Sequence, residues 1–202
     1  MMDIQIYKIF PHGFAANCYL LTADGKNAVA IDPAQPRILD EAKSRGLNVT
    51  FAILTHGHFD HIGGCAALQR AGAKIGCLDI EKPLATGNNN MAAAFGEYVA
   101  PFNIDFTYRD GDELDLSGIK LKVLATSGHT AGGACYLCGE NLFTGDTLFC
   151  GDVGRTDLPT GSGAELARSI KRLFALEGDY KIMAGHGEDT TLSAERGKKT
   201  PF

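Results

Sequence analysis

The sequence predicts an α/β protein in which two β-sheets pack face to face and helices cover their outer surfaces. Two observations predict this arrangement: apolar segments near the start follow one another as hairpins, and strand and helix patterns then alternate in each half of the chain. A third is composition, because 45% hydrophobic residues in a chain of 202 supply a substantial core. No linker or low-complexity segment divides the chain, so we expect residues 1–202 to form one domain.

Strands are expected where runs of apolar and β-branched residues are bounded by turn residues. The runs lie at 4–9, 18–22, 28–31, 49–54, 74–78, 119–125, 133–137, 142–144 and 180–184. Helices are expected where apolar residues recur at helical spacing, at 35–45, 61–71, 164–173 and 191–196. The segment from Thr86 to Asn103, which contains GNNNMAAAF, has no fixed period. We expect it to be a mobile helical insertion near the functional site.

Charge and hydropathy exclude several classes of partner. The net charge of -5 and the pI near 5.6 provide no basic surface for a phosphate backbone, so nucleic acid is not expected. The start of the chain, MMDIQIYKIF, alternates polar and apolar residues and lacks the basic and apolar regions of a secretory signal. No window has the roughly 18 apolar residues of a membrane span. We therefore expect a cytoplasmic protein.

Six cysteines are present, and because nothing suggests export we expect free thiols that are mostly buried. Cys135 and Cys138 form a C-x-x-C, which is found in zinc ribbons and in redox pairs. The chain has no second C-x-x-C, and ACYLC has the pattern of a strand. We therefore expect both thiols to be core residues.

The stretch THGHFDHIGG follows an apolar strand and holds three imidazoles and a carboxylate. One interpretation is a surface turn in which Asp60 caps a helix. The other is a metal site, because imidazole and carboxylate are ligands for zinc, iron and manganese. His56 and His58, two residues apart on an extended segment, can point the same way, while Asp60 and His61 follow where the chain turns into the helix. One metal ion cannot comfortably use all four groups, whereas two adjacent ions can.

Three further candidate ligands follow apolar strands in the same way. KLKVLATSGH ends at His129, NLFTGD ends at Asp146 and KIMAGH ends at His186. Each alone is equally typical of a hydrogen-bonded turn residue. Together, four strand ends carry the candidate ligands, and five of the six histidines lie in such turns, leaving only His12 elsewhere. This joint pattern favours a metal centre at one edge of the sheets.

The motifs THGHFDH, SGHT, GDTLF and AGHG, in this order, resemble the metallo-β-lactamase superfamily in its hydroxyacylglutathione hydrolase (glyoxalase II)-like branch. The resemblance covers residues 4–202 and implies an αββα four-layer sandwich, with two mixed sheets and helices on the outer faces. It also implies that His56, His58 and His129 hold a first metal ion and that Asp60, His61 and His186 hold a second. Asp146 would bridge the two ions. These motifs are weakly specific for the substrate, because the fold carries many chemistries.

The implied cofactors are two divalent metal ions, with zinc expected first and iron or manganese compatible with the same ligands. A water molecule that bridges two such ions would lose a proton near neutral pH and attack an acyl carbonyl. Asp60 is the candidate catalytic residue, because its carboxylate can orient that nucleophile and shuttle its proton. The sequence thus predicts a metal-dependent hydrolase whose substrate is a small acyl thioester.

Two departures from the glyoxalase II pattern concern the substrate. Full-length members continue beyond AGHG into a helical domain that contacts glutathione, whereas this chain runs from His186 only to Phe202, as in short single-domain bacterial members. The run Gly154-Arg155-Thr156-Asp157 stands where the family has Gly-Lys-Phe-Tyr. Arg155 is therefore a candidate substrate-binding residue for a carboxylate, and the alternative is that it pairs with Asp157 to fix the loop. Asp32, in AVAIDPA, is expected to support the site or a turn and not to bind metal.

Other functions remain open within the same fold. Mononuclear iron persulfide dioxygenases also carry a GRTD run, but they end in AHDY where this chain has AGHG. A β-lactam or lactone hydrolase leaves the GRTD run unexplained. A non-catalytic metal-binding protein is disfavoured, because all seven ligands are present.

Overall fold

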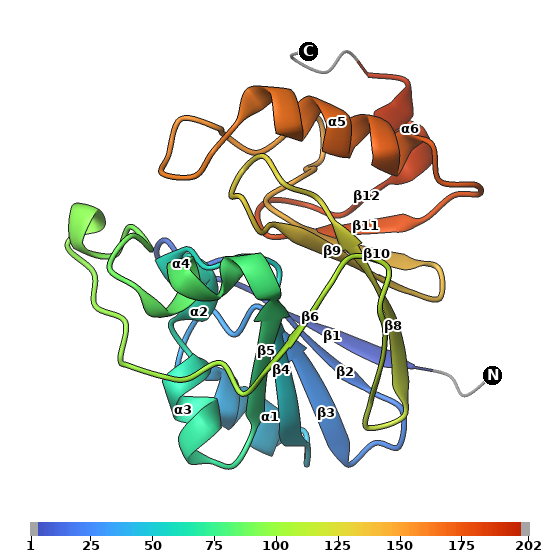
Figure 1. Cartoon of the computed structure of the whole chain (residues 1–202). Coiled ribbons are helices and arrows are strands. Elements are labelled where there is room, and N and C mark those ends of the chain that lie inside the picture. Colours follow the sequence, from blue (N-terminus) through green and yellow to red (C-terminus); the bar gives the residue numbers. More distant parts are fainter. Residues whose placement is uncertain (1–3, 199–202) are drawn as a thin grey trace.

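The computed structural model describes residues 4–198 and contains two six-stranded sheets (Figure 1). The first sheet has the order β1 (Gln5–Ile9), β2 (Cys18–Thr22), β3 (Asn27–Ile31), β4 (Asn48–Leu54), β5 (Lys74–Leu78) and β6 (Phe106–Tyr108). The second contains β7 (Glu113–Leu116), β8 (Ile119–Ala125), β9 (Ala134–Cys138), β10 (Asn141–Gly145), β11 (Lys181–Ala184) and β12 (Thr190–Thr191), in the order β12 to β7. Both sheets are mixed, because β3 to β6 pair in parallel, as do β10 and β11, while the other neighbours are antiparallel.

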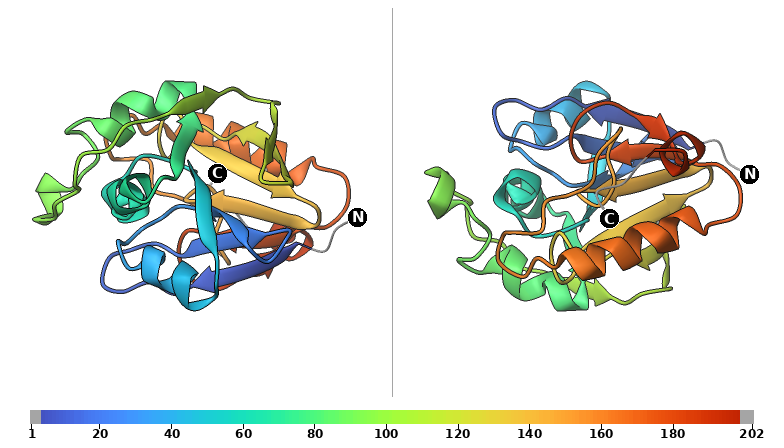
Figure 2. Two further views of the ribbon diagram at one scale, coloured as in Figure 1. Left: turned by 90° about the horizontal axis from the view of Figure 1, so that it is seen from below. Right: turned by 90° about the horizontal axis from the view of Figure 1, so that it is seen from above.

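Helices cover the two outer faces, as Figure 2 shows from above and below. The first sheet carries α1 (Ile38–Ser44), α2 (Phe59–Ile62), α3 (Cys65–Arg70) and α4 (Lys82–Thr86), and the second carries α5 (Gly163–Phe174) and α6 (Leu192–Arg196). The αββα four-layer sandwich predicted from the sequence is therefore confirmed.

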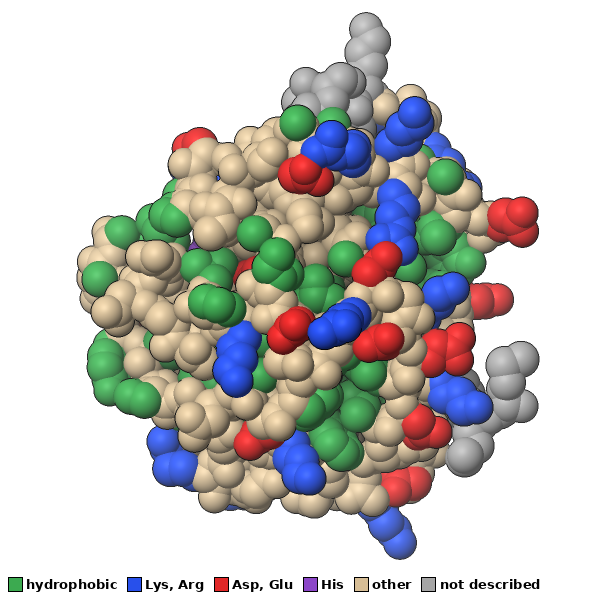
Figure 3. All heavy atoms as spheres, in the orientation of Figure 1, with side chains coloured by type: hydrophobic (Ala, Val, Ile, Leu, Met, Phe, Trp, Pro, Cys, Tyr) green, Lys and Arg blue, Asp and Glu red, His purple; other side chains and the backbone are tan. Residues whose placement is uncertain are grey.

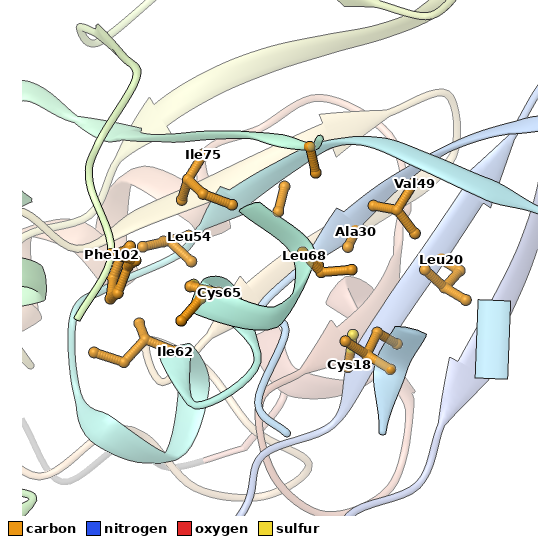
Figure 4. Close-up of a cluster of buried hydrophobic side chains, with 14 of the residues drawn as sticks. Cys18, Leu20, Ala30, Val49, Leu54, Ile62, Cys65, Leu68, Ile75 and Phe102 are labelled. Carbon is orange, nitrogen blue, oxygen red and sulfur yellow. The ribbon is translucent and has the colours of Figure 1, made fainter. Parts of the chain in front are cut away.

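Alternation along the strands builds three apolar layers from one chain. In β2, Cys18 and Leu20 face the helices on the first sheet, whereas Tyr19 and Leu21 face the second sheet. The layer between the first sheet and its helices includes Leu54, which lies next to the loop that carries the first candidate ligands (Figure 4). Burial on both faces fixes the register of the strands, because a shift of one residue would exchange the two faces.

Buried hydrogen bonds join the two sheets at the edge that holds the candidate ligands. The Tyr136 hydroxyl on β9 donates to the Leu54 carbonyl at the end of β4. The Tyr108 hydroxyl on β6 forms a hydrogen bond with the Tyr136 hydroxyl. The Tyr19 hydroxyl donates to the Ala184 carbonyl at the end of β11 over 2.6 Å. Each bond satisfies polar groups inside the core, where an unpaired group costs about 1–3 kcal/mol. The ends of β4 and β11 are thus held in fixed relation across the sandwich.

The helix expected at 61–71 is divided into α2 and α3 by Gly63 and Gly64. At this point the chain passes against the loop that follows β3, and the Gly64 N–H donates to the Pro33 carbonyl over 2.6 Å. A Cβ on Gly64 would lie 2.5 Å from the Gln35 carbonyl oxygen. The helix expected at 35–45 spans Ile38–Ser44, and Pro36 disfavours helical geometry at Gln35, the first residue of the expected range.

Short elements without a clear pattern were not predicted, namely α4, β6, β7 and β12. The segment from Thr86 to Asn103 lies beside the candidate ligands, as expected, but the expectation of a helical insertion is wrong: after α4 ends at Thr86 the segment is irregular apart from one 3-10 turn at Ala93–Phe95. The cysteine prediction is confirmed: all six thiols are free and five are buried, with Cys150 exposed. Cys135 and Cys138 pack on opposite faces of β9.

Among residues 4–198, no helix combines the length and the apolar character that crossing a bilayer requires.

The contact at Gly64 generates a test of the fold. We expect Gly64→Ala to lower the free energy of unfolding by about 1–3 kcal/mol, because the added methyl group has no room beside the Pro33 and Gln35 carbonyls. The matched control is Gly197→Ala, where φ is also helical and the new Cβ would lie 3.9 Å from the Ala194 carbonyl oxygen. Urea unfolding followed by circular dichroism measures both. Equal stabilities for the two variants would show that the helix break does not depend on this close approach.

Candidate metal centre

Seven polar side chains that follow strand ends come together where the two sheets meet. His56 and His58 lie in the loop after β4, and α2 carries Asp60 and His61. The loops after β8, β10 and β11 contribute His129, Asp146 and His186. Three sets of ligand atoms each lie within 4.8 Å of one another: His56, His58 and His129; His56, His61 and Asp146; and Asp60, His61 and His186. The structure thus brings all seven candidates of the sequence together.

Asp146 lies at the centre of this cluster. Its Oδ1 atom is 3.2 Å from Nε2 of His61, and its Oδ2 atom is 3.6 Å from Nε2 of both His129 and His186. His129 belongs to the ligand set implied for the first ion, and His61 and His186 belong to the set implied for the second. The Asp146 carboxylate therefore faces both of these sets, which is the position that a bridging ligand needs. The remaining close approach within the first set joins Nδ1 of His58 to Nε2 of His129 at 2.9 Å.

Several buried atoms of the cluster have no hydrogen-bond partner within residues 4–198. They are Nε2 of His56, Nε2 of His58, Nε2 of His61 and Oδ1 of Asp146. Buried polar atoms are nearly always paired, and leaving one unpaired costs about 1–3 kcal/mol. Four such atoms in one cluster, all of the kind that binds divalent metals, fit a metal centre.

Hydrogen bonds on the outer side of the rings fix how the imidazoles face the cluster. Asp32 Oδ2 accepts from His61 Nδ1 over 2.9 Å and from the Thr55 hydroxyl over 2.6 Å. The Thr55 oxygen in turn lies 3.1 Å from His56 Nδ1. With its hydrogen donated to Asp32, that oxygen accepts from His56, so Nε2 of both rings faces inward, and in a neutral ring this atom carries the lone pair. Asp32 therefore supports two candidate ligands, as the sequence predicted.

His129 is oriented in the same way by a backbone carbonyl. Its Nδ1 atom donates to the carbonyl of Arg155 over 2.8 Å. The guanidinium of Arg155 forms two bonds of 2.7 Å to the Asp157 carboxylate. This exposed pair fixes the loop whose backbone holds His129, so the GRTD run acts on the site through its main chain.

The cluster is electrostatically suited to a cation. Burial lowers the pKa of His58 to about 4, and burial also lowers the pKa of His56, so both rings are neutral, which is the form that binds metal. Burial alone would raise the pKa of Asp146, but the imidazoles around it, His61 first, hold that pKa well below its usual range. For His61 burial acts downward, yet Asp146 and the other carboxylates raise its pKa well above the ordinary value. A bound metal ion would take the place of that proton.

Glu81 is a site residue that sequence reasoning missed. It is buried, and its two carboxylate oxygens accept from the backbone N–H groups of Gly57 and Gly132, each over 2.8 Å. Gly57 lies between His56 and His58, and Gly132 follows His129, so one side chain spans the two loops of the first ligand set. Burial raises the pKa of Glu81. Within DIEKPL, the residue looks like an ordinary surface charge, and no sequence signal distinguishes it.

A cavity of about 410 Å³ opens beside the ligand cluster. It is lined by five of the candidate ligands and by apolar side chains that include Phe14, Phe59, Met91, Phe95 and Leu158. Arg155 is also at its wall. A similar volume, about 430 Å³, lies over β7 and β8, but no histidine or cysteine lines it, so the site chemistry belongs to the cavity beside the ligands.

Comparison with known proteins agrees with this geometry. A family model described as the metallo-beta-lactamase superfamily matches residues 12–186. The hydroxyacylglutathione hydrolase GloC of Haemophilus influenzae is 36% identical over 210 residues, which cover 100% of this chain and 98% of that protein.

Two solved structures share the fold over nearly the whole chain. TTHA1623 in a di-iron-bound form has a TM-score of 0.86 at 33% identity, covering 96% of this chain and 98% of that one. ETHE1 from Myxococcus xanthus has a TM-score of 0.78 at 27% identity, covering 96% and 82%. The family model matches most of the chain, and the strand ends carry the ligand motifs in the expected order. The chain therefore belongs to the metallo-beta-lactamase superfamily.

Proposed function

We propose that this protein is a hydrolase that holds two divalent metal ions and cleaves small acyl thioesters. The observation that carries the proposal is the convergence of seven ligand side chains, four of whose buried atoms have no partner within residues 4–198. The name of the Haemophilus influenzae relative, hydroxyacylglutathione hydrolase, supports a thioester as the substrate class.

In this proposal, His56, His58 and His129 hold the first ion, Asp60, His61 and His186 hold the second, and Asp146 faces both. Zinc is the expected metal, and iron or manganese suits the same ligands; the di-iron form of TTHA1623 supports iron as a second choice. When bound, such ions polarise a carbonyl and lower the pKa of a coordinated water from 15.7 to about 7.

Asp60 is the proposed catalytic residue. Its carboxylate lines the cavity, and its Oδ2 atom lies 3.2 Å from Nε2 of His186 and 3.9 Å from Nε2 of His61. It can orient the attacking water and accept its proton. Water then adds to the carbonyl carbon, the C–S bond breaks, and the departing thiolate takes up the proton that water lost. Arg155 is the alternative candidate for binding a substrate carboxylate, a role that requires its pair with Asp157 to open.

Metal stoichiometry tests the two-ion proposal. Chelator-treated protein is expected to bind two equivalents of Zn²⁺, measured by calorimetry and elemental analysis. His186→Ala should bind one equivalent, because it removes a ligand of the second set only. His12→Ala is the matched control, since this exposed histidine is outside the three ligand sets, and it should still bind two. Saturation of the wild type at one equivalent would contradict the two-ion centre.

The role of Asp60 predicts a loss in the chemical step. Asp60→Asn is expected to lower kcat by about 10²–10⁴-fold, because an amide keeps an oxygen ligand but cannot accept a proton. Binding of the first Zn²⁺ should change little, because Asp60 belongs to the second set. Steady-state kinetics at full metal loading, alongside metal analysis, separates the two effects. Unchanged turnover would remove Asp60 from the mechanism.

The reaction class is tested with a substrate panel. The metal-loaded protein should hydrolyse simple acyl thioesters faster than lactones or β-lactams. The released thiol is measured by its reaction with a chromogenic disulfide. Chelation should abolish the activity and Zn²⁺ should restore it. Oxygen uptake with glutathione persulfide, without thioester turnover, would instead identify a persulfide dioxygenase.

A further inference from the structure

The cavity beside the ligand cluster has an uneven chemical lining. Its acidic and imidazole groups are all candidate ligands: His58, Asp60, His129, Asp146 and His186. Apart from Arg155, the other described residues that line it are apolar or, at Gly13, glycine. A substrate bound at the ligands must therefore place its other parts against apolar surface.

Three phenylalanine rings form the apolar wall. Phe95 stacks on Phe59 with ring centroids 5.2 Å apart, and it meets Phe14 edge to face at 5.9 Å. Phe59 begins α2, which carries Asp60, while Phe14 belongs to the loop between β1 and β2. Phe14 is 62% exposed and Phe95 is 44% exposed. Aromatic surface left in contact with water beside a reaction centre favours the binding of an apolar group.

The segment that carries Phe95 is fixed in place by its backbone. The Phe59 N–H donates to the Asn90 carbonyl over 2.9 Å, and the Asn90 side chain accepts from the Ala92 N–H over 3.1 Å. Met91, between Asn90 and Ala92, has a φ of 70°, a left-handed backbone conformation that residues other than glycine rarely adopt. This turn brings Met91 and Phe95 to the cavity wall. Figure 3 shows hydrophobic side chains gathered on the side where this segment lies.

Charge argues against an anionic substrate arm at this wall. Among the described residues that line the cavity, Arg155 is the one lysine or arginine, and both arms of its guanidinium fork are bonded to Asp157. A carboxylate placed against the Phe14 and Phe95 rings would lose its hydration there, while the one cationic side chain of the wall is already paired, which is costly.

We propose that Phe14, Met91 and Phe95 form a specificity subsite for an uncharged apolar arm of the substrate. The preferred substrates are then acyl esters of alkyl or aryl thiols, and not esters of carboxylated thiols. This inference rests on the proposed thioester hydrolysis and adds the chemistry of the thiol. The wall acts by contact with the non-reacting part of the substrate, so its loss appears in the relative kcat/KM of substrates.

The test uses acetyl thioesters of 1-butanethiol, 3-mercaptopropionate and glutathione with the metal-loaded protein. Wild type should prefer the butyl ester over the mercaptopropionate ester by about tenfold or more in kcat/KM, the range that a hydrophobic pocket gives for a small apolar group. Phe95→Ala should lower kcat/KM for the butyl ester by about tenfold and change the mercaptopropionate ester by less than about twofold. Phe95→Leu, which keeps apolar surface, should retain most of the preference.

Phe10→Ala is the matched control, because Phe10 is 69% exposed in the same β1–β2 loop but does not line this cavity. It should leave the preference unchanged. A preference of wild type for the glutathione ester, or an equal loss for all esters in Phe95→Ala, would overturn the subsite while leaving thioester hydrolysis intact. A change in sedimentation mass for Phe95→Ala without a change in preference would assign the exposed rings to contact between copies of the chain.

Failure of the proposed function is recognised separately, because no thioester would then be cleaved at full metal loading. In that case the subsite is tested by binding alone. Calorimetry with a butyl thioether and its carboxylated analogue should show tighter binding of the uncharged compound, by about tenfold, in wild type and not in Phe95→Ala. Equal binding of the two compounds would overturn the subsite.

Discussion

The buried carboxylate of Asp32 is the interaction on which the geometry of the candidate metal centre depends. It lies at the end of β3 and accepts hydrogen bonds from the backbone and the side chain of Thr55 and from His61 Nδ1, over 2.6–2.9 Å. The first sheet thereby holds both the loop after β4 and the helix α2. Asp32 has a φ of 50°, and aspartate is among the residues that tolerate this conformation. A neutral side chain there would lose the charge that holds His61 with Nε2 facing inward.

The layers and the ligand set follow from local sequence patterns, which is why they were predictable. Each ligand motif stands directly after an apolar strand, so a sheet that buries those strands must gather the motifs at its edge. The apolar run from Phe51 to Leu54 predicts the strand, and the THGHFDH motif that follows it predicts the metal ligands. Supporting contacts such as Asp32 with His61 could be anticipated from the motif, because a buried imidazole ligand needs a partner for its other nitrogen.

Contacts that join distant segments could not be predicted in the same way. Glu81 matters because its carboxylate meets Gly57 and Gly132 in space, and nothing in DIEKPL indicates either partner. The break between α2 and α3 depends on carbonyl groups of the loop after β3, which the helical pattern of 61–71 does not contain. The apolar wall likewise arises only when Phe14 and Phe95, from separate loops, meet. Each of these features is set by tertiary packing and not by periodicity.

The parts of the site that local sequence patterns predict are the candidate metal ligands. The parts that arise only from tertiary packing include the cavity wall proposed to contact the substrate. The ligands stand on strand ends and on α2, and buried hydrogen bonds across the sandwich hold the ends of β4 and β11. The cavity wall stands on the β1–β2 loop and on the segment from Thr86 to Asn103, which contribute few buried apolar residues. The exposed side chains of these loops can change the surface offered to the substrate, whereas their backbone also supports the ligand loops, because the Ala16 and Asn17 N–H groups donate to the carbonyls of Asp60 and Gly185. The motifs therefore identify the reaction centre, while the choice of substrate depends on the side chains that these two loops carry.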